Sequence, residues 1–190
     1  MLAAGAGRRM GRPKALLQFQ GRLLVERGVD LLRAGGCQPV HAVVGAAADE
    51  VVASADLGTA LAVRNDEWAT GLASSLRAGL ASMPAEVEAV VIALVDQPLV
   101  TPEAIHRLIS AHHAGALLAV AMYAGEPRNP TLLARKTWTA VLAESHGDSG
   151  ARSYLRSHWE DVVPVPCDDI SSPVDLDTPA DLSILLGDDS

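Results

Sequence analysis

The chain has 190 residues, of which 49% are hydrophobic and 20% charged, and its formal net charge is −8. This length fits one domain with a sizeable core, and we expect a single domain over residues 1–190. The negative charge argues against binding to nucleic acid or an anionic membrane, because both depend on neutralising phosphate charge. No apolar run reaches the roughly 18 residues of a membrane helix, and two cysteines are too few for a disulfide scaffold. We therefore expect a cytoplasmic protein.

The chain begins with a glycine-rich segment that carries four cations. Glycines let the backbone bring amide groups close to an anion, and the cations supply compensating charge. The pattern predicts a loop that binds a triphosphate. It is not a Walker loop, because its lysine follows a proline and precedes Ala15 rather than serine or threonine. The segment reads Leu2-Ala3-Ala4-Gly5-Ala6-Gly7-Arg8-Arg9-Met10-Gly11-Arg12-Pro13-Lys14.

Short, Val/Ala-rich apolar runs alternate with helical patterns along the rest of the chain. The expected strands lie at 39–45, 60–63, 89–95, 116–122 and 162–165. The expected helices carry apolar stripes at 24–32, 72–80 and 105–109, the last opened by Thr101-Pro102-Glu103. This alternation predicts an α/β fold with a mostly parallel sheet between two helical layers. Such sheets bind ligands beyond the carboxyl ends of their strands.

Two acidic segments are candidates for metal binding. Asp96 follows the expected strand at 89–95, where a carboxylate suits magnesium, although aspartate also suits a turn or a cap. In the segment 174–182, Asp175 and Asp177 lie on the same side if the backbone is extended, and they could share one cation. Asp177 could equally serve at a helix N-terminus, because Thr178-Pro179 follows it.

The first segment resembles the signature of the MobA-like nucleotidyltransferases, most closely their molybdenum cofactor cytidylyltransferases. The matching elements are Ala-Ala-Gly, Arg-Met-Gly and Pro-Lys, and Asp96-Gln97-Pro98 has the form seen in the cytidylyltransferase branch. The resemblance extends from Leu2 to Leu182 and implies the three-layer, Rossmann-like nucleotide-diphospho-sugar transferase fold. In that fold a central strand precedes the loop. Here only Met1 and Leu2 precede Ala3, so we expect the first strand to be truncated.

The resemblance also implies site residues. Two later segments, 125–130 and 147–152, match loops that line the acceptor pocket, although their Gly, Asp, Asn and Pro residues equally suit ordinary turns. Asn129 and Arg152 are the acceptor-side candidates. For magnesium, the resemblance implies Asp96 together with Asp177 or, slightly less favoured, Asp175. The nucleotide-binding candidates are Leu2, Ala3, Ala4, Gly5, Gly7, Arg9, Lys14, Gly71 and Ser75.

The implied activity is transfer of CMP from CTP to the terminal phosphate of molybdopterin, with Mg²⁺ as cofactor. Arg9 and Lys14 would neutralise the leaving pyrophosphate, and Asp96 would hold the metal. Ala4 stands where the guanylyltransferase branch typically has glycine, which predicts CTP rather than GTP. The alternatives are guanylyl transfer to the same pterin and nucleotidyl transfer to another phosphate, such as a sugar phosphate. A noncatalytic carrier that hands the cofactor to a molybdoenzyme is a further alternative, and a molybdoenzyme is in any case a possible transient partner.

Overall fold

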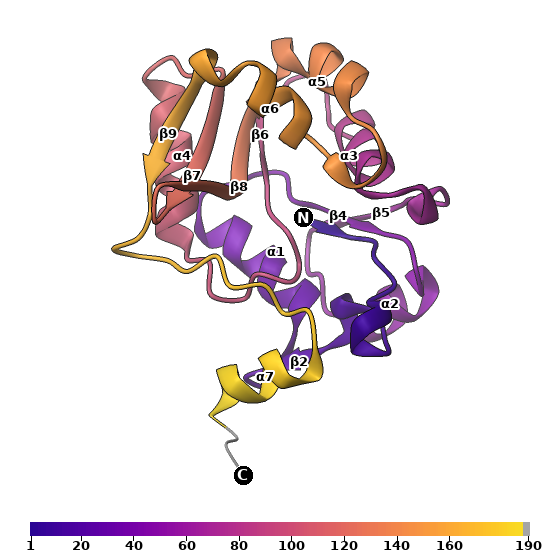
Figure 1. Ribbon diagram of the computed structural model, residues 1–190. Helices are drawn as coiled ribbons and strands as arrows, with labels where there is room; N and C mark the ends of the chain where they lie inside the picture. Colours follow the sequence, from indigo (N-terminus) through magenta and orange to yellow (C-terminus); the bar gives the residue numbers. More distant parts are fainter. Residues whose placement is uncertain (188–190) are drawn as a thin grey trace.

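Short apolar segments form the strands of a mostly parallel sheet in the computed structural model, which describes residues 1–187 (Figure 1). Three strands pair in parallel, with β1 next to β4 and β4 next to β5. The expected apolar runs at 39–45 and 60–63 thus form buried and edge strands of one sheet. Their bounds are β1 (Leu2–Ala3), β4 (His41–Val44) and β5 (Leu61–Arg64).

Four more strands continue the sheet in the order β6, β8, β7, β9. Strand β8 is antiparallel to both of its neighbours, whereas β7 and β9 are parallel. Strand β1 joins the two groups, because the Leu2 N–H donates to the Ala93 carbonyl (2.9 Å) and the Val95 N–H donates to the Leu2 carbonyl (3.1 Å). The bounds are β6 (Ala89–Ile92), β7 (Leu118–Tyr123), β8 (Glu126–Ala134) and β9 (Val162–Pro166).

Helices cover both faces of the sheet, which confirms the expected three-layer arrangement. Helices α1 and α4 lie on one face, and α3, α5 and α6 lie on the other (Figure 1). Each face of the sheet has its own hydrophobic core, and successive side chains at β1 enter them in turn. Ala3 packs with residues of α1, whereas Leu2 and Ala4 pack with residues of α3. The bounds are α1 (Leu24–Ala34), α2 (Ala48–Ser54), α3 (Leu72–Ala81), α4 (Pro102–His113), α5 (Trp138–Glu144) and α6 (Arg152–Ser157).

The expected strands and helices are all present, but β8, a small hairpin and the helices α2, α5 and α6 were not predicted from the sequence. Strand β8 begins with Glu126-Pro127-Arg128-Asn129-Pro130, whose residue types are typical of turns, so the expectation placed a loop there. The hairpin pairs β2 (Gln18–Phe19) with β3 (Arg22–Leu23) and precedes α1. Strand β1 comprises two residues and still occupies a central place between β4 and the segment after β6.

Leu176 packs the C-terminal segment against the glycine-rich loop. Its side chain is 0% exposed and packs with Met10, Leu17, Phe19 and Leu24. Its backbone N–H donates to the carbonyl oxygen of Asp96 at 2.8 Å. Burial of a leucine contributes roughly 1.5–3 kcal/mol. This contact therefore holds the acidic segment beside both the loop and the end of β6.

Helix α7 (Pro179–Leu186) begins directly after the acidic segment. Thr178 is its N-cap, and the Asp181 carboxylate accepts hydrogen bonds from the backbone N–H groups of Asp177 and Thr178 at 2.9 and 2.7 Å. The capping carboxylate is thus Asp181, so the side chain of Asp177 is left for other partners. None of the helices within residues 1–187 is long and apolar enough to span a membrane.

Candidate active site

The glycine-rich loop leaves the carboxyl end of β1 and folds back on itself in two short helical turns, Arg8–Met10 and Lys14–Leu16. Gly7 has a φ of 60°, and a Cβ at this position would overlap the carbonyl oxygen of Arg12. Only glycine fits both the backbone angle and the space. Gly5 has open space beside it. Gly7 therefore keeps the first turn of the loop close to Arg12, and two of the four cations, Arg9 and Lys14, contact the acidic segment.

Lys14 joins two carboxylates that are far apart in the sequence. Its Nζ donates to Oδ2 of Asp96 at 2.7 Å and to Oδ1 of Asp177 at 2.7 Å. Arg9 approaches Asp177 from the solvent side, with Nη1 at 3.1 Å from Oδ2. The structure thus brings together four of the residues that the sequence predicts for catalysis and metal binding.

The electrostatics of this group follow from those contacts. Burial acts to lower the pKa of Lys14, but the hydrogen bonds and charges of Asp177 and Asp96 outweigh it and raise the pKa above its usual value. The hydrogen bond from Lys14 holds the pKa of Asp177 below the usual range of an aspartate. Lys14 and Asp177 are therefore both charged at neutral pH.

The donor set fits a hard divalent cation. Oδ1 of Asp96 is buried and has no hydrogen-bond partner among the described residues, so one carboxylate oxygen is available for a further ligand. Magnesium prefers oxygen ligands and is often bound by one or two carboxylates plus substrate phosphates. Within residues 1–187, no three His, Cys, Asp or Glu side chains lie close enough to hold a metal between them. A cation at Asp96 and Asp177 would thus complete its shell with phosphate oxygens and water.

Asp175 and Asp177, which the sequence predicts could share one cation, have different hydrogen-bond partners in the structure. Oδ1 of Asp175 accepts a hydrogen bond from Nε2 of Gln97 at 2.9 Å. Partial burial raises the pKa of Asp175; the charges of Asp96 and Asp177 also raise it, and the hydrogen bond from Gln97 opposes the shift. On either side of the buried Leu176, one carboxylate contacts Gln97 and the other contacts Lys14. Of the pair, Asp177 has the better geometry for a metal beside Asp96.

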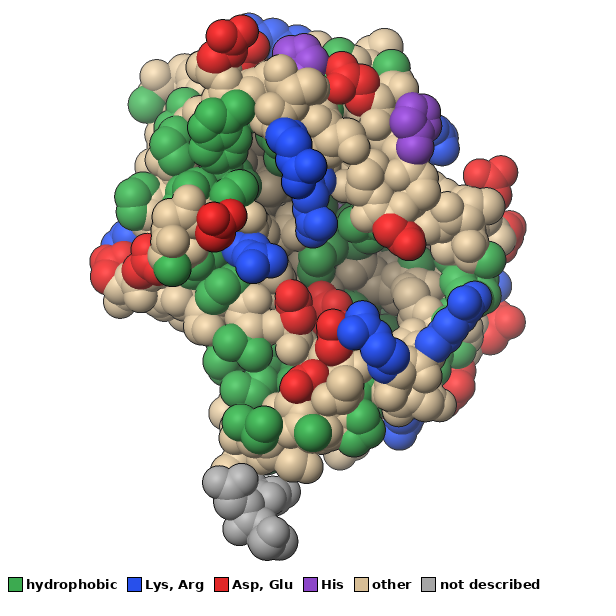
Figure 2. Space-filling model, in the orientation of Figure 1, with side chains coloured by type: hydrophobic (Ala, Val, Ile, Leu, Met, Phe, Trp, Pro, Cys, Tyr) green, Lys and Arg blue, Asp and Glu red, His purple; other side chains and the backbone are tan. Residues whose placement is uncertain are grey.

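A pocket of about 580 Å³ lies beside this charged group, at the carboxyl ends of β1 and β6. One part of its lining is apolar and includes Leu2, Leu72, Leu76, Ile92 and Leu155, and polar or charged side chains form much of the rest. In the space-filling view, basic side chains and a group of acidic side chains face one hollow in the middle of the molecule (Figure 2). The pocket therefore combines an apolar body with charged groups at its margin, as ligand sites commonly do.

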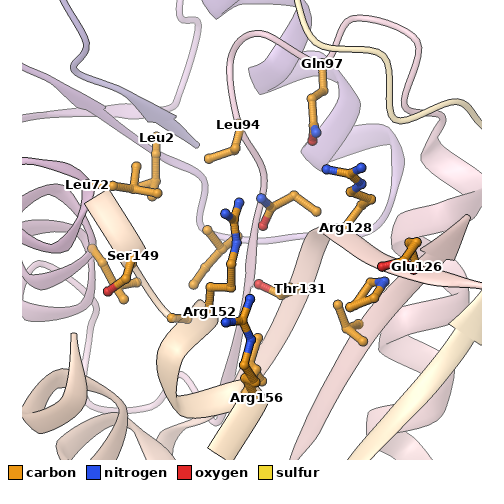
Figure 3. Close-up of a pocket in the computed structure, with 18 of the residues that line it drawn as sticks. Leu2, Leu72, Leu94, Gln97, Glu126, Arg128, Thr131, Ser149, Arg152 and Arg156 are labelled. Atoms are coloured by element: carbon orange, nitrogen blue, oxygen red, sulfur yellow. The ribbon is translucent and has the colours of Figure 1, made fainter. Parts of the chain in front are cut away.

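Three arginines reach the pocket from two elements (Figure 3). Arg128 comes from β8, and Arg152 and Arg156 lie one turn apart on α6. Both acceptor-side candidates, Asn129 and Arg152, line this pocket. The sequence reading missed Arg128, Arg156 and Gln97. The spacing of four residues between Arg152 and Arg156 was the available signal, because residues i and i+4 share one helix face.

The segment 65–75 contributes less directly than the resemblance implies. Ser75 is only 3% exposed, and Nδ2 of Asn65 donates to Oγ of Ser74 and Oγ of Ser75 at 2.9 and 3.0 Å. Ser75 does not line the pocket. Gly71 has a φ of 113°, and a Cβ there would come within 2.5 Å of the Gly147 backbone. In the structure, Asn65 thus holds the two serines in the first turn of α3, and Gly71 lets the loop 147–150 lie close to the start of that helix.

The residues of β1 and the alanine that follows it are also buried in the protein core. Leu2, Ala3 and Ala4 are buried, and Leu2 alone of the three lines the pocket. The methyl group of Ala4 lies against Gly45 and belongs to the same cluster as Trp68 and Leu76. Ala4 does not line the pocket, so any influence on a bound base would act through neighbours such as Leu76, which does.

Comparison with known proteins agrees with the fold and the loop. Residues 1–162 match the model of the MobA-like NTP transferase domain. The chain belongs to this family. It is 38% identical to nicotine blue oxidoreductase from Paenarthrobacter nicotinovorans over 185 residues, which cover 94% of this chain and 90% of that protein.

Two solved structures resemble this MobA-like chain over nearly its whole length. The homologue of Rv0371c from Mycobacterium sp. strain JC1 has a TM-score of 0.87 and 34% identity, covering 98% of this chain and 93% of that one. Rv0371c of Mycobacterium tuberculosis H37Rv in complex with manganese has a TM-score of 0.79 and 29% identity, covering 98% and 95%. A related protein of the same fold has therefore been seen with a divalent cation.

The close approach of Gly71 to Gly147 predicts a large cost for a side chain at this position. We expect Gly71→Ala to lower the free energy of unfolding by about 1–3 kcal/mol more than Gly115→Ala, because the methyl group would crowd the Gly147 backbone. Gly115 is a matched control: its φ is 106°, and no heavy atom lies within 4 Å of the added Cβ. Urea denaturation of both variants measures the difference. Equal losses would mean that backbone strain alone matters at Gly71.

Proposed function

We propose that this MobA-like NTP transferase transfers CMP from CTP to the terminal phosphate of molybdopterin and releases pyrophosphate. The observation that carries the proposal is the grouping of Arg9, Lys14, Asp96 and Asp177 beside a pocket that is lined by three arginines and by the neighbouring Gln97 and Asp175. Such a site suits the joining of two phosphate-bearing molecules. Phosphoryl chemistry needs mainly positioning and charge stabilisation, and these residues supply both.

The reaction needs no general base from the protein. A phosphate monoester has its second pKa near about 6 and is mostly a dianion at neutral pH. One of its oxygens forms the new bond to the α-phosphorus of CTP, while the bond from that phosphorus to the oxygen bridging the α- and β-phosphates breaks. Pyrophosphate leaves with the electron pair. Lys14 and Arg9 would then stabilise the charge that gathers on the leaving group.

We propose Mg²⁺ as the cofactor, held by Asp96 and Asp177. The manganese complex of Rv0371c, which is 29% identical to this chain, supports a divalent cation in this family. When bound, the cation would offset negative charge on the phosphates. Asp175, which accepts a hydrogen bond from Gln97, would instead face the acceptor pocket.

The acceptor side of the proposal rests on the basic groups of the pocket. Arg128, Arg152 and Arg156 form no ion pair within 4.0 Å among the described residues, although the chain as a whole is acidic. Unpaired arginines beside an apolar wall suit a flat, phosphate-bearing acceptor, because guanidinium groups bind phosphate and apolar walls bind a ring system. A phosphorylated pterin has both features. Asn129, on the same strand as Arg128, would add a polar contact.

A different class of activity has one observation in its favour. The relative that is 38% identical over 94% of this chain is named as an oxidoreductase acting on nicotine blue. The pocket's apolar walls would also accept such a dye, and we therefore carry a reductase as the second candidate. The two candidates differ in their products. A reductase consumes an electron donor, whereas a transferase releases pyrophosphate and joins its two substrates.

We expect purified protein with Mg²⁺, CTP and molybdopterin to release pyrophosphate and to form a product whose mass equals molybdopterin plus CMP minus water. We expect kcat/KM with CTP to exceed that with GTP by at least about tenfold, the scale of discrimination by pocket shape alone. Parallel reactions contain GTP, or nicotine blue with NADH or NADPH. Equal or better use of GTP would reassign the nucleotide, and dye reduction without pyrophosphate release would favour the reductase.

The arginine pair on α6 gives a test of the acceptor side. We expect Arg156→Ala to raise the acceptor KM by about 10- to 100-fold with little change in the KM for CTP, because a hydrogen bond to a charged group contributes about 1.5–3 kcal/mol. Arg77→Ala is the matched control, since Arg77 is an exposed helix arginine that does not line the pocket. Steady-state kinetics with each substrate varied in turn would separate the effects. A rise confined to the CTP KM would place Arg156 on the nucleotide side.

A further inference from the structure

The ammonium group of Lys14 occupies one oxygen of each of the two carboxylates that a divalent cation would use, and Oδ1 of Asp96 has no partner among the described residues. Its Nζ lies 2.7 Å from Oδ2 of Asp96 and 2.7 Å from Oδ1 of Asp177, and the lysine side chain is only 16% exposed. Both contacts are charge-assisted hydrogen bonds. Magnesium binds such oxygens at about 2.0–2.1 Å. A cation that joined the two carboxylates through these oxygens would therefore have to displace the lysine.

Of the groups in this contact, Lys14 is the one free to move. The backbone of the acidic segment is fixed on both sides of the site, because the Leu176 N–H donates to the Asp96 carbonyl at 2.8 Å and the Asp177 N–H donates to the Asp181 carboxylate at 2.9 Å. Lysine carries its charge on a flexible four-carbon stem with freely rotating donors. The carboxylates can thus stay in place while the ammonium group leaves them.

The charge balance decides what can displace the lysine. Lys14 and Arg9 balance the charges of Asp96 and Asp177, so these four side chains together are neutral, and the carboxyl group of Asp175 lies close to them. A divalent cation that entered alone would add two positive charges next to two cations. A complex of the cation with a nucleoside triphosphate is an anion, and its phosphates offer Lys14 a new partner.

We propose that Lys14 prevents the free protein from binding a divalent cation, and that the metal enters only together with the triphosphate that draws Lys14 away. The inference rests on the proposed function for the use of a triphosphate. It deepens that function by making the metal–nucleotide complex the substrate that the site accepts. Lys14 thus has two successive partners, the carboxylates in the free protein and the phosphates in the complex.

Titration of the free protein with Mn²⁺, followed by the electron paramagnetic resonance signal of the unbound ion, tests the proposal. We expect Lys14→Gln to bind Mn²⁺ at least about tenfold more tightly than wild type, since loss of a buried partner leaves the carboxylate charges uncompensated. Arg9→Gln is the matched control. It also removes one positive charge from Asp177, but its side chain is 72% exposed and such pairs contribute little. We expect it to change the affinity by less than about threefold.

Two further measurements complete the design. The double variant Lys14→Gln/Asp96→Asn should lose the gained affinity, which assigns the gain to this site. Adding CTP to wild-type protein should increase the Mn²⁺ retained with the protein on ultrafiltration. Equal Mn²⁺ affinity of wild type and Lys14→Gln would overturn the proposal, as would an equal gain in Arg9→Gln.

The proposal can be tested even if Lys14→Gln is unstable and even if molybdopterin is not the acceptor. If Lys14→Gln unfolds at room temperature, its melting temperature with and without Mn²⁺ replaces the titration, because a cation that binds the folded state raises the melting temperature. A rise no larger than that of wild type would contradict the proposal. The titration of the free protein uses neither CTP nor molybdopterin, so failure of the transfer assay leaves its result unaffected.

Discussion

The contact of Lys14 with Asp96 and Asp177 is the interaction on which the rest of the site depends. It joins three segments that are distant in the sequence: the glycine-rich loop, the end of β6 and the segment before α7. Each charge in it is matched by an opposite charge within hydrogen-bond distance, which allows partial burial at modest cost. In the proposed order of binding, the metal and the triphosphate enter together, because the lysine must first leave the oxygens that it contacts.

The sheet explains why these segments meet. Strand β1 is parallel to β4 and forms a parallel bridge with the segment after β6, so the glycine-rich loop and Asp96 emerge at the same edge. Strand β8 is antiparallel, and its first residues return to that edge with Arg128 and Asn129. The hydrophobic contact of Leu176 with Met10 and Phe19 adds the third segment. The site is thus a consequence of strand order and of one buried leucine.

Much of this arrangement could be predicted from the sequence, because the signals are local. The glycine-rich loop, the apolar runs and Asp96 at a strand end are read from neighbouring residues, and Thr178-Pro179 marks the start of α7. The partners of Asp175 and Asp177 could not be predicted, because Gln97 and Lys14 are far from them in the sequence and are brought close only by the fold. Ser75 had the residue type of a ligand-binding group, but its hydroxyl is buried against Asn65. The place of Arg128 in the pocket could not be predicted, because the prolines beside it are typical of a turn rather than of a strand.

Nucleotidyl transfer is the central claim, and the fate of the α-phosphate of CTP tests it most directly. In a reaction with Mg²⁺ and molybdopterin, one sample contains CTP labelled with ³²P at the α-position and another contains CTP labelled at the γ-position. The account predicts that the α-label appears in the pterin product and the γ-label in pyrophosphate. Release of the α-label as free CMP, or retention of both labels in unreacted CTP, would contradict it.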